Sequence, residues 1–149
     1  MTPIAANDTG APDPVLLFDG ECGLCQRVVR GLLRLDTKGR LRFAPLQGPS
    51  AQAYLRAHGL PTADFETIVF VRNWAAPEPA GFLLRTDGVI AALRACGLGG
   101  ARSAKLVSVW PAPWRDAAYR AIGHWRYRIF GPWRPRPLPR PEWADRFLP

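Results

Sequence analysis

The stretch VLLFDGECGLCQRVV, residues 15–29, contains the pattern from which the fold can be worked out. Four apolar residues run into Asp19-Gly20, which is typical of a short buried strand that ends in a turn. Two cysteines three positions apart, Cys22 and Cys25, then begin a segment whose apolar residues recur at helical spacing. A strand that leads through a tight turn into a helix places both cysteines at the start of that helix.

The start of a helix determines what the two thiols can do. The first backbone N–H groups have no partner inside the helix and its dipole is positive there, so a thiolate at Cys22 is stabilised and its pKa falls. Cys25 lies one turn on and on the same face, where it can attack a mixed disulfide formed on Cys22. We therefore expect Cys22 to be the nucleophile and Cys25 the resolving thiol, with Gly23 leaving access to the Cys22 sulfur.

Two carboxylates flank the expected helix start. Asp19 and Glu21 are close to the cysteines in sequence, and a nearby negative charge raises the pKa of a thiol. We therefore expect a weaker oxidant than a dithiol flanked by cations. Asp19 has two interpretations: its side chain closes the turn at the end of the strand, or it relays a proton for the thiols.

The cysteine pair alone leaves three interpretations open: a redox dithiol, half of a zinc site, or two inert buried thiols. Zinc normally takes four ligands, and the other candidates, Cys96, His58 and His124, include no second close pair. Cys96 is expected to be a buried structural thiol on the apolar face of a helix. A phosphatase of the haloacid-dehalogenase type also begins with such a strand, but it has Asp where Glu21 stands here.

Length and composition are those of a single globular domain. The 149 residues are 48% hydrophobic and 11% aromatic, which is enough to bury a core without disulfides. The first residues lack the basic start and apolar core of a secretory signal, so none is expected, and no apolar run approaches the roughly 18 residues of a membrane span. Three cysteines are too few for a disulfide framework. We therefore expect a cytoplasmic protein whose paired cysteines serve redox or metal chemistry.

Hydrophobic periodicity gives the order of the elements. An opening βαβ unit, a helix, a hairpin and a further helix follow one another, which is the order of a thioredoxin-like sheet. The expected fold is therefore α/β, with a thioredoxin-like βαβ-α-ββα core, extra C-terminal helices and a Pro-rich tail. The predicted strands are 15–19, 41–46, 67–71 and 81–86, and the predicted helices are 22–38, 47–58, 88–96, 101–110 and 113–131.

Glycine, proline and capping residues set the expected bounds of these elements. Gly39 is expected to stop the first helix, and Pro45 indicates that its strand lies at a sheet edge or ends there. Asp87 is expected to cap the helix that begins at Gly88. Three glycines are expected to end that helix: Gly97, Gly99 and Gly100.

The chain divides into three expected parts. Residues 1–13 are expected to be a flexible N-terminus, and residues 14–131 the thioredoxin-like domain with its C-terminal helices. Residues 132–149 contain six prolines and four arginines. They are expected to form an extended tail that wraps on the body or lies in solvent.

Positive charge and tryptophan are concentrated toward the C-terminus. The net charge is +8, and from Trp114 onward there are eight arginines against three acidic residues. A basic, aromatic C-terminal segment can bind nucleic acid, anionic lipid or an acidic partner, although an ordinary Arg-rich surface is the plainer interpretation.

One apolar stripe at helical spacing in this segment is expected to face the core: Trp114, Ala118, Ile122, Trp125 and Ile129. Arg126 and Arg128 have three possible roles. They cover aromatic neighbours, they pair with carboxylates of the domain, or they lie near the dithiol, where their positive charges offset the negative charges of Asp19 and Glu21.

Several ordered blocks resemble one family. Asp19-Gly-Glu-Cys22-Gly-Leu-Cys25 after an apolar strand resembles the signature of the DCC family of thiol–disulfide oxidoreductases, which is named for this Asp and the two Cys. Further blocks that resemble the family lie at 42–47, 67–71, 84–87, 115–119 and 126–131. The resemblance therefore covers most of the chain.

The resemblance implies a thioredoxin-like fold and a CxxC dithiol at Cys22 and Cys25, with no other cofactor. Its partners would be protein or small-molecule thiols and disulfides. This chain differs at one position from the thioredoxins and at another from many members of the DCC family. Thioredoxins place a cis-proline just before the third strand, where this chain has Glu66-Thr67, so substrate docking is expected to differ. Pro132-Trp-Arg-Pro replaces a cysteine that many family members carry after the last block.

The sequence therefore predicts a thiol–disulfide oxidoreductase that uses Cys22, Cys25 and Asp19. A rival from another class is a non-catalytic binding module with a basic, Trp-rich C-terminal face, and a zinc-binding structural domain is the third possibility. Nucleic acid is not the expected partner, because no recognition motif accompanies the charge and the aromatics.

Overall fold

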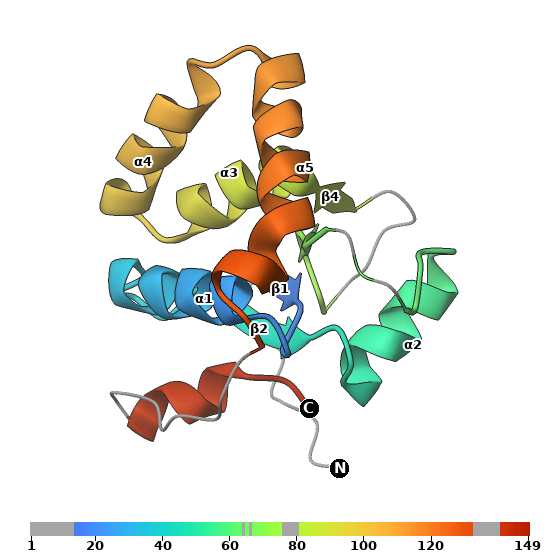
Figure 1. Ribbon diagram of the computed structural model, residues 1–149. Helices are drawn as coiled ribbons and strands as arrows, with labels where there is room; N and C mark the ends of the chain where they lie inside the picture. Colours follow the sequence, from blue (N-terminus) through green and yellow to red (C-terminus); the bar gives the residue numbers. More distant parts are fainter. Residues whose placement is uncertain (1–13, 64, 66, 76–80, 133–140) are drawn as a thin grey trace.

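The computed structural model describes residues 14–63, 65, 67–75, 81–132 and 141–149, and within them four strands form one mixed sheet (Figure 1). The strands lie in the order β2-β1-β3-β4. β1 pairs with β2 in parallel and with β3 antiparallel, and β4 is antiparallel to β3. The strands are β1 (Val15–Phe18), β2 (Arg42–Pro45), β3 (Val69–Val71) and β4 (Phe82–Leu84). This is the thioredoxin-like arrangement that the order of elements predicts.

Helices cover both faces of the sheet (Figure 1). Leu16 and Phe18 pack on the side of α1 and α3, whereas Val15 and Leu17 pack on the side of α2. β1 is apolar throughout because both of its faces are covered. The helices are α1 (Gly23–Leu35), α2 (Pro49–Ala57), α3 (Arg85–Ala95), α4 (Leu98–Ser108) and α5 (Ala112–Ile129), and the C-terminal 3-10 helix is η1 (Pro141–Arg146). Among the described residues, no helix is both long and apolar enough to cross a bilayer.

Helix α1 ends at Leu35, three residues before the predicted end, because Asp36 terminates it. The buried Asp36 carboxylate accepts hydrogen bonds from the backbone N–H groups of Leu41, at 2.7 Å, and Arg40, at 3.2 Å. It also pairs with the Arg146 guanidinium. Gly39, with φ +65°, lies in the loop beyond the helix.

The prediction for the helix after β4 is wrong at its start, whereas its end near Cys96 and Gly97 is confirmed and only the roles of Gly99 and Gly100 differ. α3 begins at Arg85, so Asp87 lies in its first turn rather than capping it. At the other end Cys96 and Gly97, the latter with φ +90°, separate α3 from α4, and Gly99 and Gly100 lie inside α4. At Gly100 the two helices approach so closely that an added Cβ would overlap the carbonyl oxygen of Leu93. This glycine therefore serves helix packing rather than helix termination.

The apolar stripe of α5 faces solvent, contrary to the sequence-based expectation. No residue of α5 is buried, and Trp114, Ile122, Trp125 and Ile129 are all exposed. The partly covered face of the helix carries Asp116, Tyr119 and Arg126 instead. The physical reason is that α1 and α3 already cover this side of the sheet, so α5 lies outside them (Figure 1).

The last residues of the chain pack against the edge of the sheet. The Leu148 N–H donates to the carbonyl oxygen of Phe43 at 2.7 Å, and the Phe147 and Phe43 rings lie 5.6 Å apart. This contact covers β2, the edge strand that contains Pro45, and so protects its unpaired side. The predicted flexible segment 1–13 and residues 133–140 of the predicted tail lie outside the described residues.

The close approach at Gly100 gives a test of the α3–α4 packing. We expect Gly100→Ala to lower the free energy of unfolding by about 1–3 kcal/mol, because the methyl group overpacks the contact. Gly99→Ala is the matched control: its nearest neighbour atom would lie at 3.8 Å, and alanine favours the helix by about 1 kcal/mol. Urea unfolding followed by circular dichroism measures both. Equal stabilities of the two variants would contradict this packing.

Candidate active site at the start of helix α1

The paired cysteines lie where β1 turns into α1. Cys22 is the N-cap residue of α1 and Cys25 lies in its first turn. Asp19 shapes the turn between them and β1: its carbonyl accepts from the Cys22 N–H at 3.3 Å and its Oδ1 accepts from the Glu21 N–H at 3.0 Å. Both cysteines are free thiols in this structure. The local sequence places them as expected, and the structural interpretation of Asp19 is supported directly.

The two thiols differ strongly in acidity. The Cys25 thiol donates a hydrogen bond to the Cys22 sulfur, and this contact lowers the pKa of Cys22 to about 6 against the opposing effect of burial. The backbone N–H groups of Cys25 and Leu24 and the charge of Arg126 also lower it. The pKa of Cys25 is raised well above its ordinary value because Cys25 keeps the shared proton and is partly withdrawn from water. The pair therefore ionises first at Cys22, while Cys25 remains a thiol.

Arg126 of α5 brings a positive charge to the pair. Its Nη1 donates to the Cys25 sulfur at 3.8 Å, and its Nη2 lies 3.3 Å from Oδ2 of Asp19. Arg128 lies instead over the ring of Trp125. Glu21 is exposed to solvent, and the pKa of Cys22 is lowered by the Cys25 hydrogen bond, by backbone N–H groups and by Arg126. The expectation that the pair is a weaker oxidant than a dithiol flanked by cations stays a prediction.

Asp19 is the centre of a buried polar cluster. Its side chain, 3% exposed, accepts hydrogen bonds from Nε2 of Gln47 and from the hydroxyl of Tyr127, each at 2.6 Å. Gln47 also accepts from the Gly20 N–H at 3.0 Å. Burial and the hydrogen bond to Asp19 raise the pKa of Tyr127 above its ordinary value. Sequence reasoning did not single out Gln47 or Tyr127, although both lie in the blocks 42–47 and 126–131 that resemble the DCC family.

The chain segment after α5 covers the nucleophile candidate. The Gly23 N–H donates to the carbonyl oxygen of Gly131 at 3.2 Å, Cys22 forms an isolated β-bridge with Pro132, and Cys22 is 0% exposed. A Cβ at Gly23 would lie 2.8 Å from the carbonyl oxygen of Phe130. Gly23 therefore admits the covering segment instead of opening a path to the sulfur, which corrects the expectation from sequence. Cys25 is only partly buried.

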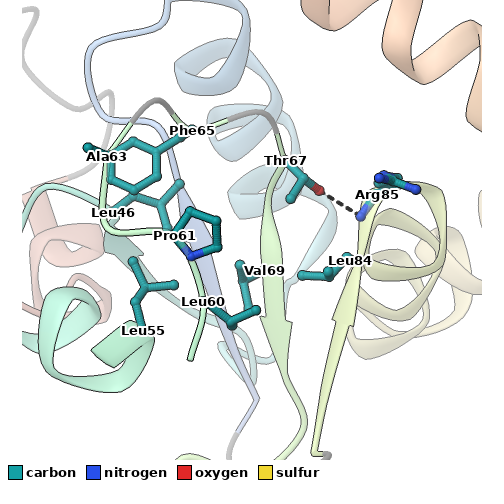
Figure 2. A pocket seen from close by; sticks show the side chains of 10 residues that line it. All are labelled: Leu46, Leu55, Leu60, Pro61, Ala63, Phe65, Thr67, Val69, Leu84 and Arg85. Carbon is teal, nitrogen blue, oxygen red and sulfur yellow. Dashed lines mark hydrogen bonds between the residues drawn. The ribbon is translucent and has the colours of Figure 1, made fainter. Parts of the chain in front are cut away.

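Three hollows surround this cluster. A polar hollow of about 510 Å³ includes Asp19, Glu21, Gln47, Arg126 and Tyr127 in its walls. An apolar hollow of about 100 Å³ touches Cys25. A second apolar cavity, of about 430 Å³, lies between the end of α2, the segment that follows it and strands β3 and β4 (Figure 2). Ala63 and Phe65 line both this cavity and the polar hollow, so the two are neighbours.

The other metal-ligand candidates lie apart from the pair. Cys96 is buried and its thiol donates to the carbonyl oxygen of Ala92 at 3.2 Å, and burial raises its pKa to about 12. The structure thus confirms Cys96 as a structural thiol. His58 stacks on Tyr54, and His124 packs edge-on against Trp125. Within the described ranges, no three Cys, His, Asp or Glu side chains gather as a metal site would require.

The fold and the site together define a thioredoxin-like protein with paired thiols at the start of its first helix. The family model described as DCC1-like thiol-disulfide oxidoreductase matches residues 16–132. The chain belongs to this family, which confirms the resemblance seen in the sequence.

Two relatives extend the comparison. An uncharacterized protein of Bacillus subtilis, YuxK, is 35% identical over 138 residues, which cover 93% of this chain and 96% of that protein. A chloroplastic DCC family protein of Arabidopsis thaliana is 26% identical over 118 residues, which cover 79% of this chain and 65% of that protein. No solved structure matches the chain.

The charge of Arg126 gives a test of the site's electrostatics. Arg126→Gln is expected to raise the pKa of Cys22 from about 6 by about 1, equivalent to about 1.4 kcal/mol, because a neighbouring cation no longer favours the thiolate. The ultraviolet absorbance of the thiolate during a pH titration measures this change, and Cys96 stays protonated throughout the range. Arg128→Gln, a change of the same charge on the same helix, is expected to leave the curve in place. Indistinguishable curves for the Arg126 variant and the unmodified protein would contradict the role of Arg126.

Proposed function

We propose that this protein is a thiol–disulfide oxidoreductase in which Cys22 attacks and Cys25 resolves. The observation that carries the proposal is the pair of free thiols at the start of α1, with Nη1 of Arg126 3.8 Å from the Cys25 sulfur. The lowered pKa of Cys22 agrees with it, because a thiolate is the attacking form of a cysteine. Membership of the DCC1-like family supports a redox function for the chain.

The proposed reaction uses the two sulfurs in sequence. The Cys22 thiolate attacks one sulfur of a substrate disulfide, forms a mixed disulfide, and releases the other sulfur as a thiolate that takes up a proton. Cys25 then loses its proton and attacks the Cys22 sulfur, which releases the second substrate thiol. The substrate gains two electrons and the protein is left with a Cys22–Cys25 disulfide. A small-molecule or protein dithiol reduces this disulfide again, so no bound cofactor is required.

A change in the pKa of Cys25 explains why Cys25 reacts second, after the mixed disulfide has formed on Cys22. While Cys22 is a thiolate, its charge and the shared hydrogen bond keep the pKa of Cys25 high. Once Cys22 is bound in a mixed disulfide, that negative charge is gone, while Arg126 still lies at the Cys25 sulfur. The pKa of Cys25 must then fall. Asp19 serves as a positioning residue that holds Arg126 and closes the turn.

Substrate access requires movement of the segment at Gly131 and Pro132. That segment contacts the helix start through the Gly23–Gly131 backbone hydrogen bond and the bridge to Pro132. An extended substrate chain could take over the same backbone pairing when the segment moves aside. Protein or small-molecule disulfides in a reducing, cytoplasmic compartment are the proposed substrates, since three cysteines are too few for the disulfide framework of an exported protein.

A redox titration of the Cys22–Cys25 pair is the first test of the proposal. In glutathione buffers, Cys22 and Cys25 are expected to pass together through a reversible two-electron transition at roughly −200 to −300 mV. Alkylation followed by mass spectrometry reports the state of each cysteine. If neither cysteine oxidises or alkylates without denaturant, the thiols are structural and the proposal fails.

Single cysteine variants separate the two roles. Cys25→Ser is expected to accumulate a mixed disulfide on Cys22 because the resolving thiol is missing. Cys22→Ser is expected to lose net disulfide reduction by roughly a hundredfold or more, because the nucleophile is missing. Intact-mass analysis after incubation with an aromatic disulfide measures the first, and substrate turnover the second. Cys96→Ala is the control and should retain exchange; an adduct on Cys25 rather than Cys22 would reverse the assignment.

A further inference from the structure

The hairpin formed by α4 and α5 presents an apolar tip to solvent. We define this tip as residues 106–114, between the last turn of α4 and the first turn of α5. Four of its large side chains are strongly exposed: Leu106 (74%), Val109 (77%), Trp110 (58%) and Trp114 (65%). In Figure 1 the connection between the two helices, in the middle of the tip, lies at the top of the molecule, away from the sheet.

The chemistry of the tip suits a hydrocarbon surface. Residues 106–114, LVSVWPAPW, contain no charged side chain, and the hydroxyl of Ser108 is already bonded to the carbonyl oxygen of Lys105 at 2.9 Å. The Trp110 and Trp114 rings lie 6.4 Å apart. Tryptophan is enriched at the boundary between lipid and water because its ring is apolar and its N–H is polar. Apart from the two indole N–H groups, the tip offers little that could read a nucleic-acid base or a polar peptide.

Basic residues surround the tip, and acidic ones are almost absent. Arg102 and Lys105 on α4 and Arg120 on α5 are exposed, and residues 88–115 contain no Asp or Glu. The two acidic residues that flank this range, Asp87 and Asp116, each interact with a neighbouring side chain. Asp116 accepts from the Thr86 hydroxyl at 2.7 Å, and Asp87 lies 3.9 Å from Arg115. The apolar tip therefore stands in a field of positive charge.

We propose that the α4–α5 hairpin docks on the surface of an anionic lipid bilayer. The tip enters the interfacial region, and Arg102, Lys105 and Arg120 lie among the headgroups. Apolar and aromatic side chains combined with basic ones are what binding at an anionic interface requires. An uncharged partner would leave the basic rim without a counterpart, and a nucleic acid would leave the aliphatic tip without one.

The docked face is continuous with the surroundings of the dithiol. The tip residues Leu106, Trp110 and Trp114 also line an open cavity of about 590 Å³. Val89, Tyr119 and Ile122 line both this cavity and the small hollow that touches Cys25. Docking would thus hold the redox site close to the membrane surface. Only this consequence rests on the proposed function; the docking itself does not depend on thiol chemistry.

Sedimentation with vesicles tests the proposal on the full chain. The protein is expected to bind vesicles of phosphatidylcholine with phosphatidylglycerol at least tenfold more tightly than vesicles of phosphatidylcholine alone. Added salt is expected to weaken this binding. The double variant Trp110→Ser, Trp114→Ser is expected to bind at least tenfold less tightly than the unmodified protein, with an unchanged melting temperature, because both side chains are exposed.

A matched control removes an equally exposed apolar side chain elsewhere. Ile129→Ser lies at the far end of α5, where Ile129 is 70% exposed, and is expected to bind as the unmodified protein does. Equal binding by the double tryptophan variant, or an equal loss with Ile129→Ser, would overturn the proposal. Binding to an acidic peptide or to DNA without binding to anionic vesicles would also overturn it, in favour of that partner. Because the assay needs no redox activity, an inactive dithiol would not affect its outcome.

Discussion

The contact between Asp19 and Arg126 is the interaction on which the rest of the site depends. It joins the end of the central strand to a helix more than a hundred residues later in the chain. A buried carboxylate–guanidinium pair is stable only if further hydrogen bonds replace lost water. Here Gln47, Tyr127 and the Glu21 N–H supply them. The same guanidinium reaches the Cys25 sulfur, so the contact that anchors α5 also sets the charge around the thiols.

Helix α5 therefore affects the cysteine pair in two opposite ways. Its Arg126, in addition to the larger effect of the Cys25 hydrogen bond, lowers the pKa of Cys22 and so favours the thiolate. The residues that follow it, Gly131 and Pro132, cover that same sulfur. A reactive but covered thiolate is protected from unspecific oxidation, since reactivity needs access as well as acidity. Substrates that can displace the covering segment would then be favoured over others.

The position of α5 also explains its unusual surface. A helix on the outside of a finished core needs no wide apolar stripe toward the body, and the covered face of α5 carries Asp116, Tyr119 and Arg126. Its apolar residues are left for solvent or for a partner. Trp114, in the first turn of α5, joins the exposed apolar residues at the end of α4 in the tip. One helix thus contributes to the polar site near its C-terminal end and to the candidate docking surface at its N-terminal end.

The sequence by itself determined the α/β class, the order of the elements, the cysteine pair at the start of α1, the edge position of the strand with Pro45, and the buried Cys96. These features follow from local periodicity and turn chemistry, which neighbouring residues decide. Only the tertiary structure decided that Arg126 rather than Arg128 contacts the Cys25 sulfur and that the segment after α5 covers Cys22. It also decided that Gly100 allows α3 and α4 to pack closely and that the apolar stripe of α5 is exposed to solvent. Periodicity shows that a helix has an apolar face but not which face meets the body. Contacts between residues a hundred positions apart depend on how the layers stack, and no local pattern records that.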